Sequence, residues 1–447
     1  MKKIHISENL KNVGRISFGT IIGQLISLFS IPLLTRIYGP KIIGNWAFIN
    51  SISMIINSFS DLGLSNAIMT EENDENVNDV YKIISTIGIL IILILCLIIF
   101  VFKYNFQNRI LLMIDLVCIF IFSVTSQQIQ ISYIWLNRKK KYNILMKNPL
   151  INNSCLTLIA ILLSVLGNKN YGYYIAIIIS QFITLIHMKK HIPMKLFIFD
   201  YDKYKFYLKK NINFILYQMP STVILQFKGQ LPTFLIKSLF GAEILGYYSV
   251  AVRLLNMPIS LLAKSLGNVF FQIGSELKRK NEDIGEYLLV NINNSMKLAT
   301  IPIILLLSFG DLVIYFLFGN YYQISATLLR IMTFYGFFLF LSMSVNGIAI
   351  LLEKQKYTLI SGISQIVLFS IGIIFGKIFF NSIYFSIFLM SISFCLIQII
   401  YFCIIFKETQ INLKRYLKPL IIQTIVIVIF YIMIRYCLYY FNLVNSF

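Results

Sequence analysis

Apolar segments long enough to cross a bilayer follow one another along almost the whole chain, with short polar turns between them. A helix needs about 20 mostly apolar residues to span the hydrocarbon core of a membrane. The pattern predicts twelve such helices, at residues 13–37, 43–67, 81–102, 110–136, 144–166, 171–188, 211–237, 246–272, 289–317, 325–352, 357–380 and 383–406. A further apolar run at 417–441 is expected either to cross the membrane or to lie along its interface.

The composition agrees with a protein embedded in a membrane. Hydrophobic residues make up 58% of the 447 residues and charged residues 13%, whereas a soluble domain carries about a quarter charged residues. No loop between the apolar segments is long enough to fold as a separate domain. The predicted fold class is therefore an all-α polytopic membrane protein.

Lysine and arginine residues are distributed unequally between alternate loops. With the N-terminus in the cytoplasm, the cytoplasmic loops hold 26 of the 39 basic residues and the outer loops hold 8, Arg435 among them. This distribution obeys the positive-inside rule and predicts a multi-pass membrane protein with a cytoplasmic N-terminus. Insertion and contact with anionic membrane lipid then explain the formal net charge of +21, and no nucleic-acid partner is expected.

Two glycine-containing turns in different halves of the chain resemble each other. The first reads Tyr-Gly-Pro-Lys-Ile-Ile-Gly-Asn-Trp from Tyr38, and the second reads Phe-Gly-Ala-Glu-Ile-Leu-Gly-Tyr-Tyr from Phe240. Each follows a predicted helix that contains proline, a residue that bends helices. The alternative to an internal repeat is that short glycine turns recur by chance in a helical membrane protein. The agreement predicts two pseudo-symmetric six-helix lobes around a central cavity and a C-terminal hydrophobic segment, with boundaries at 1–200, 201–410 and 411–447.

Five basic residues lie inside the predicted spans of the second half, namely Lys228, Arg253, Lys264, Lys297 and Arg330. A cation in hydrocarbon is costly, so such residues usually face a water-filled cavity or a partner. The predicted spans of the first half contain no comparable Lys or Arg. The pattern therefore predicts that one wall of the cavity attracts an anion.

Polar residues at helical spacing mark the faces expected to line this cavity. In the span 246–272 they recur every three or four residues, at Arg253, Asn256, Ser260, Lys264, Asn268 and Gln272. The first half has polar stripes with hardly any charge, which include Gln24 and Asn57. Amides and hydroxyls bind sugars, while Lys and Arg bind phosphate or carboxylate, so the two walls suit a sugar attached to phosphate.

Several of these residues also have a simpler explanation. Lys264 and Arg330 lie near the ends of their spans, where a long side chain can reach water. Asp311 could neutralise Arg330 or Lys297, which would weaken the case for an anion. Asp61, near the inner end of the second span, is either a candidate for ion coupling or a packing-level charge close to water.

The remaining reactive residues indicate neither catalysis nor a metal site. The six cysteines have no Cys-x-x-Cys spacing and are expected to pack as small apolar residues. The three histidines do not suggest a catalytic or metal-binding set, no phosphate-binding loop motif occurs, and no cofactor is expected. The acidic stretch between Glu71 and Asp79 is expected to be a solvated loop, with a partner contact as the alternative.

Three segments resemble a known family of transporters. Residues 32–44, Pro-Leu-Leu-Thr-Arg-Ile-Tyr-Gly-Pro-Lys-Ile-Ile-Gly, and 61–67, Asp-Leu-Gly-Leu-Ser-Asn-Ala, look like the start of bacterial polysaccharide exporters. The stretch from Gly241 to Arg253 looks like the hairpin of their second lobe. The match is to the O-antigen and capsule flippases of the multidrug/oligosaccharidyl-lipid/polysaccharide export superfamily.

The resemblance implies two V-shaped lobes, with a central cavity that opens alternately to each face of the membrane, and no enzymatic activity. It implies that an oligosaccharide linked to a lipid diphosphate, expected to be undecaprenyl diphosphate, is flipped from the cytoplasmic to the outer leaflet. Other membrane proteins of polysaccharide and lipopolysaccharide assembly are the partners it suggests. Arg253 occupies the family's arginine position in the second lobe, and Asp61 is the candidate coupling acid of the first three spans.

Three other functions compete with this interpretation. A multidrug exporter of the same superfamily would bind cations, which the five intramembrane cations disfavour. A polysaccharide polymerase or a lipid-dependent glycosyltransferase usually needs a sizeable outer loop or acidic residues beside it. A passive scaffold for assembly enzymes is the third alternative.

Overall fold

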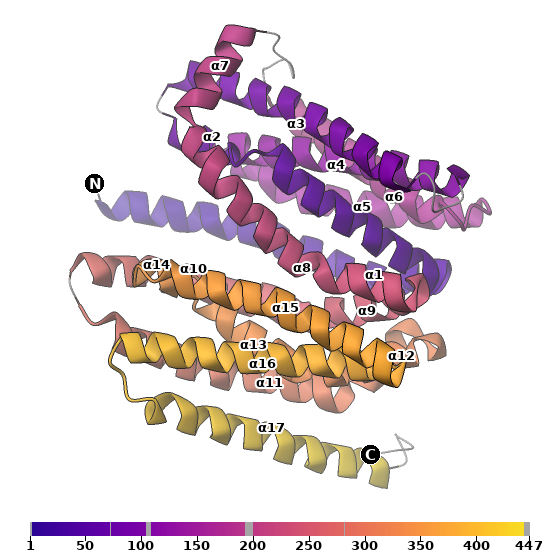
Figure 1. The fold of residues 1–447 in the computed structure, drawn as a ribbon, viewed down its shortest axis with the longest axis vertical. Coiled ribbons are helices and arrows are strands. Elements are labelled where there is room, and N and C mark those ends of the chain that lie inside the picture. The colour runs from indigo at the N-terminus through magenta and orange to yellow at the C-terminus, as the bar shows by residue number, and fades with distance from the viewer. Residues whose placement is uncertain (1, 72, 104–108, 193–199, 281, 442–447) are drawn as a thin grey trace. The chain divides into compact units, whose positions relative to one another are not determined.

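The structure is a computed structural model that describes residues 2–71, 73–103, 109–192, 200–280 and 282–441. Among the side chains, those of residues 2–21, 24, 25, 28, 66, 70, 74, 103 and 109–112 lie outside this description. Every regular element in the described ranges is a helix, which confirms the predicted all-α fold class (Figure 1). The chain forms two compact units, Met1–Phe234 (unit 1) and Leu235–Phe447 (unit 2).

Unit 1 is built from one long bent helix and several shorter ones. Its elements are α1 (Lys2–Ser60), α2 (Ser65–Thr70), α3 (Asp74–Lys103), α4 (Arg109–Arg138), α5 (Tyr142–Val165), α6 (Gly172–Lys189), α7 (Tyr201–Lys210), the π-helix η1 (Phe214–Gln218) and α8 (Met219–Phe240). The predicted span 13–37 and residues 43–60 of the next one are two arms of α1, which meet at Gly39, whereas residues 65–67 belong to α2. The division between the units falls inside α8, later in the chain than the predicted boundary at residue 200.

Glycine turns in both units have the same backbone geometry. Gly39 has φ 75° and ψ 168°, Gly241 has φ 89° and ψ 175°, and Gly319 has φ 87° and ψ 178°. This region of backbone space is essentially restricted to glycine, because the Cβ atom of another residue is strained there. The two turns that the sequence pairs, at Gly39 and Gly241, both have this geometry, and Gly319 shares it outside the predicted repeat.

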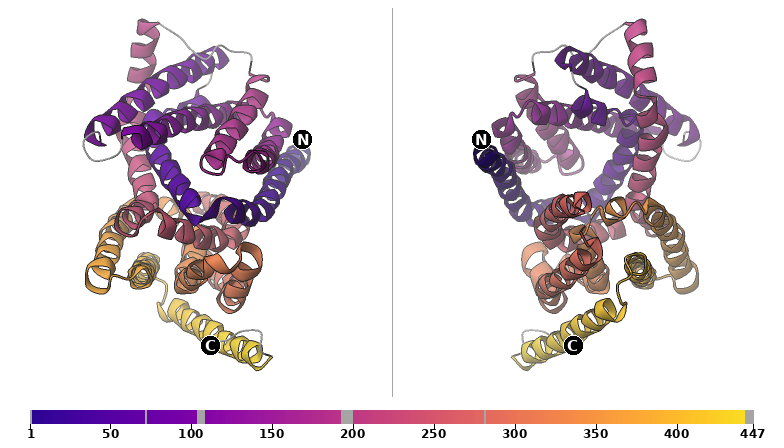
Figure 2. Two further views of the ribbon diagram at one scale, coloured as in Figure 1. Left: turned by 90° about the vertical axis from the view of Figure 1, so that its right-hand side faces the viewer. Right: turned by 90° about the vertical axis from the view of Figure 1, so that its left-hand side faces the viewer.

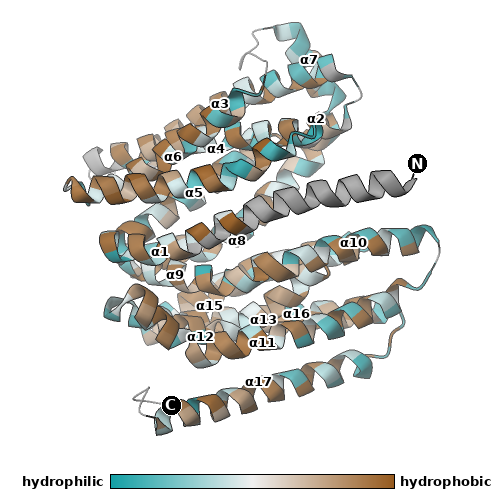
Figure 3. Ribbon diagram, turned by 180° about the vertical axis from the view of Figure 1, so that it is seen from behind, coloured by the Kyte–Doolittle hydropathy of each residue, from teal (hydrophilic) through white to brown (hydrophobic). Residues whose placement is uncertain are grey.

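Eleven helices in the described ranges are long and apolar enough to cross a membrane. Hydrophobic residues run along the long helices of both units (Figure 3). One of the eleven is α17 (Lys414–Tyr440), so the apolar run at 417–441 forms a helix of full spanning length. These helices support the predicted multi-pass membrane protein.

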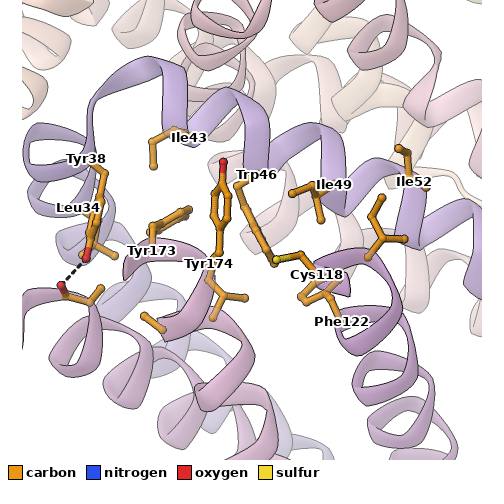
Figure 4. Packing of buried hydrophobic residues seen from close by; sticks show 14 of the residues in the cluster. Leu34, Tyr38, Ile43, Trp46, Ile49, Ile52, Cys118, Phe122, Tyr173 and Tyr174 are labelled. Carbon is orange, nitrogen blue, oxygen red and sulfur yellow. Dashed lines mark hydrogen bonds between the residues drawn. The ribbon is translucent and has the colours of Figure 1, made fainter. Parts of the chain in front are cut away.

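Aromatic side chains form the core of unit 1 around the second arm of α1 (Figure 4). The Trp46 ring packs edge-on against Phe122 of α4, with 4.9 Å between ring centroids, and lies 5.5 Å from Tyr174 of α6. The Tyr38 hydroxyl donates a 2.6 Å hydrogen bond to the backbone oxygen of Ala160 in α5. Edge-on aromatic pairs contribute about 0.5–1.5 kcal/mol beyond their burial. Because Tyr38 and Trp46 flank the bend of α1, this core fixes the bend in place.

Unit 2 contains the helices that carry most of the predicted cations. Its elements after α8 are α9 (Ala242–Pro258), the π-helix η2 (Ile259–Ala263), α10 (Lys264–Arg279), α11 (Ile284–Phe318), the 3₁₀ helix η3 (Asn320–Tyr322), α12 (Gln323–Ile331), α13 (Thr333–Ser344), α14 (Ile348–Leu351), α15 (Gln355–Phe380), α16 (Ile383–Glu408) and α17. Within the unit, α9 packs against α12, α11 against α13 and α17, and α15 against α16.

Polar contacts hold α17 at the edge of unit 2 (Figure 2). Arg415, in the first turn of α17, pairs with Glu286 in the first turn of α11. In the middle of the two helices, Thr300 Oγ1 donates a 2.8 Å hydrogen bond to Gln423 Oε1. Near the other end of α17, Arg435 is bound by a carboxylate of α11, as described below. The helix is thus attached to α11 along most of its length.

Candidate substrate-binding site

The polar stripe predicted for residues 246–272 lies on an exposed face of unit 2. It runs along α9, η2 and α10, which follow one another without a break. Arg253 is half-buried, and the other five residues are exposed, namely Asn256, Ser260, Lys264, Asn268 and Gln272. The opposite face of the same helices is buried in the unit at Leu255, Ala263, Gly267 and Phe270. These helices are therefore amphipathic in the way that the spacing predicts.

The π-helix η2 helps to keep this stripe on one face. Residues four apart are rotated by about 40° around an α-helix, because each turn takes 3.6 residues. A π-helix holds more residues in each turn, so the four-residue steps from Asn256 to Lys264 drift less across Ile259–Ala263. Pro258 stands just before this turn and has no backbone N–H to donate. Single π-helical turns inside α-helices are frequent at functional sites.

The two cations of the stripe have no carboxylate partner within the part of the chain that the structure describes. Neither Arg253 nor Lys264 forms an ion pair or a side-chain hydrogen bond there. The sequence between Arg253 and Gln272 contains no acidic residue. An exposed face with amides, hydroxyls and uncompensated cations can bind an anionic ligand that is rich in hydroxyl groups.

Arg330 differs from these two cations because a carboxylate binds it. Its Nη2 lies 2.5 Å from Asp311 Oδ2, and Arg435 Nη1 lies 2.8 Å from the same oxygen. One carboxylate thus joins α11, α12 and α17. The alternative that Asp311 neutralises Arg330 is confirmed, and Arg330 is left out of the set of binding cations proposed below.

The outer-loop position predicted for Arg435 is wrong. The side chain is 1% exposed, and its Nη1 contacts the Ser308 carbonyl at 3.4 Å as well as Asp311. Arg435 follows the apolar core of its segment and precedes several tyrosines, so the sequence alone suggests an exposed end. Its partner Asp311 is 124 residues away, and local spacing cannot show that contact.

Lys297 and Lys228 belong to other helices than the stripe, α11 and α8. Lys297 is exposed on α11, on the same face as Val290 and Ile301, which are 54% and 63% exposed. Apolar neighbours one and two turns away on an exposed face are typical of contact with lipid. Lys228 is half-buried on α8, one turn from Leu225, which is 59% exposed. Their assignment as substrate-binding residues stays a prediction.

The structure describes part of the polar wall predicted for unit 1. The side chain of Gln24 lies outside the described residues. Asn57 is half-buried on the second arm of α1, and its Oδ1 has no hydrogen-bond partner among the described atoms. One turn earlier, Ser53 Oγ is likewise buried without a described partner. Both atoms are buried, so the role of this wall in binding hydroxyl groups stays a prediction.

Asp61 follows the last turn of α1. Its Oδ1 accepts a hydrogen bond from the Ser65 hydroxyl. Burial raises the pKa of the Asp61 carboxyl above its usual value, and the bond from Ser65 offsets part of that effect. A carboxyl that keeps its proton more readily than in water is compatible with a role in ion coupling, which stays a prediction.

The sequence pattern misses a cation that contacts the interior of unit 1. The pattern assigns Lys189 to the loop that follows, but this residue is the last of α6. Its Nζ donates hydrogen bonds to the Tyr81 hydroxyl of α3 and, at 3.3 Å, to Gln128 Oε1 of α4. Tyr81 in turn lies 3.1 Å from Ser132 Oγ, and Gln128 Nε2 donates to Ser85 Oγ at 2.8 Å. The polar residues inside the apolar segments of α3 and α4 were the available signal for this network.

The solvated loop predicted for the acidic stretch is wrong for Glu71 and Asp79. Glu71 Oε2 lies 2.7 Å from Lys210 Nζ, and Asp79 Oδ2 lies 2.7 Å from Lys203 Nζ. The two acidic side chains are only 9% and 17% exposed. Both lysines belong to α7, so the acidic stretch binds this helix within unit 1.

Two of the six cysteines pack as the sequence predicts. Cys96 and Cys118 are buried in the apolar core of unit 1, which confirms the packing role predicted for them. Among the described residues, no group of three or more His, Cys, Asp or Glu side chains is placed to hold a metal ion.

Comparison with known sequences gives one family. A model of the family described as polysaccharide biosynthesis protein matches residues 33–327. The teichuronic acid biosynthesis protein TuaB of Bacillus subtilis (strain 168) is 27% identical over 172 residues, which are 38% of this chain and 34% of that protein. The match to this relative therefore spans about a third of its length.

Comparison with solved structures gives one type of fold. The lipid II flippase MurJ in an inward closed conformation is similar with a TM-score of 0.69 and 18% identity, over 96% of this chain and 99% of that chain. An inward-facing multidrug resistance MATE family transporter of the MOP superfamily is similar with a TM-score of 0.59 and 15% identity, over 89% of this chain and 98% of that chain. At these identities the similarity concerns the fold alone.

Proposed function

Because the chain belongs to the polysaccharide biosynthesis protein family, which confirms the resemblance seen in its sequence, we propose that it is a lipid-linked oligosaccharide flippase. It moves its substrate from the cytoplasmic to the outer leaflet of the bacterial plasma (inner) membrane by alternating access through a cationic cavity. The proposed substrate is a repeat unit of O-antigen or capsule on undecaprenyl diphosphate. The protein acts as a transporter and not as an enzyme.

The observation that carries this proposal is the exposed face of α9, η2 and α10. It presents Arg253 and Lys264 without a carboxylate partner among the described residues, with amides and a hydroxyl between and beyond them. A lipid diphosphate with a glycan offers the complementary groups, namely phosphate oxygens and sugar hydroxyls. Arg253 binds a phosphate, since a guanidinium can hold phosphate oxygens in bidentate geometry.

The other site residues receive subordinate roles in the proposal. Asn256 bonds sugar hydroxyls beside Arg253, and Gln24 and Asn57 are further amides proposed to bind sugar hydroxyls. Lys228 and Lys297 are additional cations for the diphosphate. Anionic membrane lipid and other membrane proteins of polysaccharide assembly are the proposed partners.

The membrane potential can drive this export without a coupling ion. When the inside of the membrane is negative, moving one negative charge outward is favoured by about 2.3 kcal/mol per 100 mV. The free energy of a diphosphate therefore falls when it moves from the cytoplasmic to the outer leaflet. Asp61 is the proposed site of ion coupling if export also requires a proton or a cation gradient.

The test is export in cells that depend on this protein for their surface polysaccharide. We expect Arg253→Ala to reduce surface polysaccharide and to let the lipid-linked precursor accumulate inside, because the phosphate loses its guanidinium. Lys418→Ala, which removes an exposed lysine of α17, is the matched control and leaves export unchanged. Both variants are first checked for wild-type amounts of folded protein in the membrane.

Lys297→Ala is tested in parallel because Lys297 has exposed apolar neighbours, which are typical of a position in contact with lipid and not of a cavity. The proposal expects a loss of export here as well. Wild-type export by well-folded Arg253→Ala and Lys297→Ala variants would contradict the cationic cavity. Loss of export at Arg253 alone would restrict the cavity to the stripe of α9, η2 and α10.

The competing functions lead to other results. A multidrug exporter would bind an organic cation directly, whereas Arg253 and Lys264 repel one. A passive scaffold would support polysaccharide synthesis even when Arg253 is replaced, provided that its contacts with assembly enzymes remain. Precursor accumulation in the Arg253→Ala strain, with those contacts intact, excludes the scaffold.

A further inference from the structure

We propose that the transported glycan carries a second anionic group, a carboxylate of the uronic-acid type, and that Lys264 binds it while Arg253 binds the diphosphate. This inference rests on the proposed function and names the chemical class of its substrate. It follows from the separation of the two cations on one continuous helical face and from the absence of acidic groups between them.

The two cations are too far apart to share one diphosphate. Lys264 follows Arg253 by eleven positions, which is about 16 Å along the helix axis at 1.5 Å per residue. Helical side chains lean toward the N-terminus of their helix, so both charged heads are displaced in the same direction and their separation is kept. A diphosphate bound to one cation therefore leaves the other without a counter-charge.

Screening makes the two positions independent. Exposed charges separated by more than about 10 Å interact weakly at 0.1 M salt. Arg253 and Lys264 therefore form two anion sites and not one extended patch of charge. A ligand that satisfies both needs two anionic groups with a spacer between them.

The residues between and beyond the cations suit a sugar as that spacer. Asn256 and Ser260 lie between Arg253 and Lys264, and both are exposed. Ser260 Oγ donates to the Met257 carbonyl of its own helix, which leaves its oxygen free to accept a bond from a sugar hydroxyl. Asn268 and Gln272 continue the same face beyond Lys264.

The cluster around Asp311 in unit 2 shows cations that a carboxylate of the protein compensates. Arg330 and Arg435 share the Asp311 carboxylate, and Arg435 is buried. Those arginines serve the packing of α11, α12 and α17. Lys264 is exposed and forms no ion pair among the described residues, so an anionic group of a ligand can supply its counter-charge.

The experiment compares two synthetic probes with the full-length protein in nanodiscs of neutral phosphatidylcholine. Both are short-chain polyprenyl diphosphates that carry a disaccharide, one ending in glucuronic acid and the other in glucose. A third probe, the polyprenyl diphosphate without sugar, reports the diphosphate contact alone. Affinities are measured for the wild type, Lys264→Ala, Arg253→Ala and the control Lys418→Ala.

The wild type is expected to bind the acidic probe at least about tenfold more tightly than the neutral probe, and the ratio should fall as salt is raised. Lys264→Ala should lower that ratio to near one and leave the affinity for the sugar-free probe unchanged. Arg253→Ala should weaken all three probes and preserve the ratio. Lys418→Ala should match the wild type.

The outcomes separate this inference from the function on which it rests. Equal binding of the acidic and neutral probes by the wild type, or an unchanged ratio in folded Lys264→Ala, overturns the acidic glycan and leaves the flippase proposal intact if the sugar-free probe still binds. Failure of every diphosphate probe to bind the wild type overturns the proposed function itself.

Discussion

The two units stabilise their interiors with different chemistry. Between the long helices of unit 1, neutral groups bond across helices, such as Gln128 with Ser85 at 2.8 Å and Thr125 with Gln181 at 2.5 Å, whereas the ion pairs of Glu71 and Asp79 involve the short helix α7. In unit 2, the Asp311 carboxylate of α11 binds two arginines from α12 and α17. The difference teaches that a cation in an apolar segment indicates a ligand only when no carboxylate of the protein compensates it.

The largest effect is expected from breaking the ionic contact of unit 2. Asp311→Ala leaves the Arg330 and Arg435 guanidiniums without their shared carboxylate, and removing one partner of a buried ion pair costs about 3–5 kcal/mol. The free energy of unfolding in detergent, or the temperature of unfolding, measures this loss. Arg415→Ala, which breaks the exposed pair with Glu286, should cost at most about 1 kcal/mol. Similar losses for the two variants would contradict the buried ionic contact.

A matched pair of glycine substitutions tests whether the two units share one turn. Gly39→Ala and Gly241→Ala each place a Cβ on a backbone with positive φ, which costs about 1–3 kcal/mol even though the surrounding space is open. Gly229→Ala in α8 is the control, because it meets open space in an ordinary helix and should be neutral or slightly stabilising. Unequal losses at positions 39 and 241 would argue against the repeat.

A smaller effect is expected from the hydrogen-bond network around Tyr81 in unit 1. Tyr81→Phe removes the hydroxyl that contacts Lys189 and Ser132, and the loss of such a hydrogen bond costs about 0.5–1.5 kcal/mol. Tyr133→Phe, at an exposed position of α4, is the control and should leave the unfolding temperature unchanged. Equal unfolding temperatures for Tyr81→Phe and the wild type would show that the network adds nothing to stability.

The smallest effect concerns Asp61 and depends on pH. Because burial raises the pKa of this carboxyl above 3.8, the folded protein binds the proton more tightly than the unfolded chain. The contribution of Asp61 to stability therefore falls as pH rises through the raised pKa. Asp61→Asn should unfold at a higher temperature than the wild type at neutral pH, and the gap should close as the pH is lowered toward 4. A gap that does not change with pH would contradict the raised pKa.

The periodicity of the sequence predicts much of the fold and part of the site. Apolar runs indicate the helices, and the spacing of Arg253, Asn256, Ser260 and Lys264 gives their common exposed face. These features depend on contacts within one helix, whose geometry is regular. The bend at Gly39 is predictable for the same reason, since a short local pattern encodes it.

Contacts between distant segments account for the errors. The pairing of Arg435 with Asp311, of Lys210 with Glu71 and of Lys189 with Tyr81 joins residues more than 100 positions apart. Charge and hydropathy along the chain assign such residues to loops or to water. Only the packing of the helices decides which cations a carboxylate of the protein compensates.

The most direct test of the central claim is the affinity for a polyprenyl diphosphate in neutral-lipid nanodiscs, compared between the wild type and the Arg253→Ala/Lys264→Ala double variant at low and high salt. The account predicts wild-type binding that weakens with salt and at least a tenfold loss in the double variant, about 1.4 kcal/mol. An unchanged affinity in a folded double variant would contradict the account.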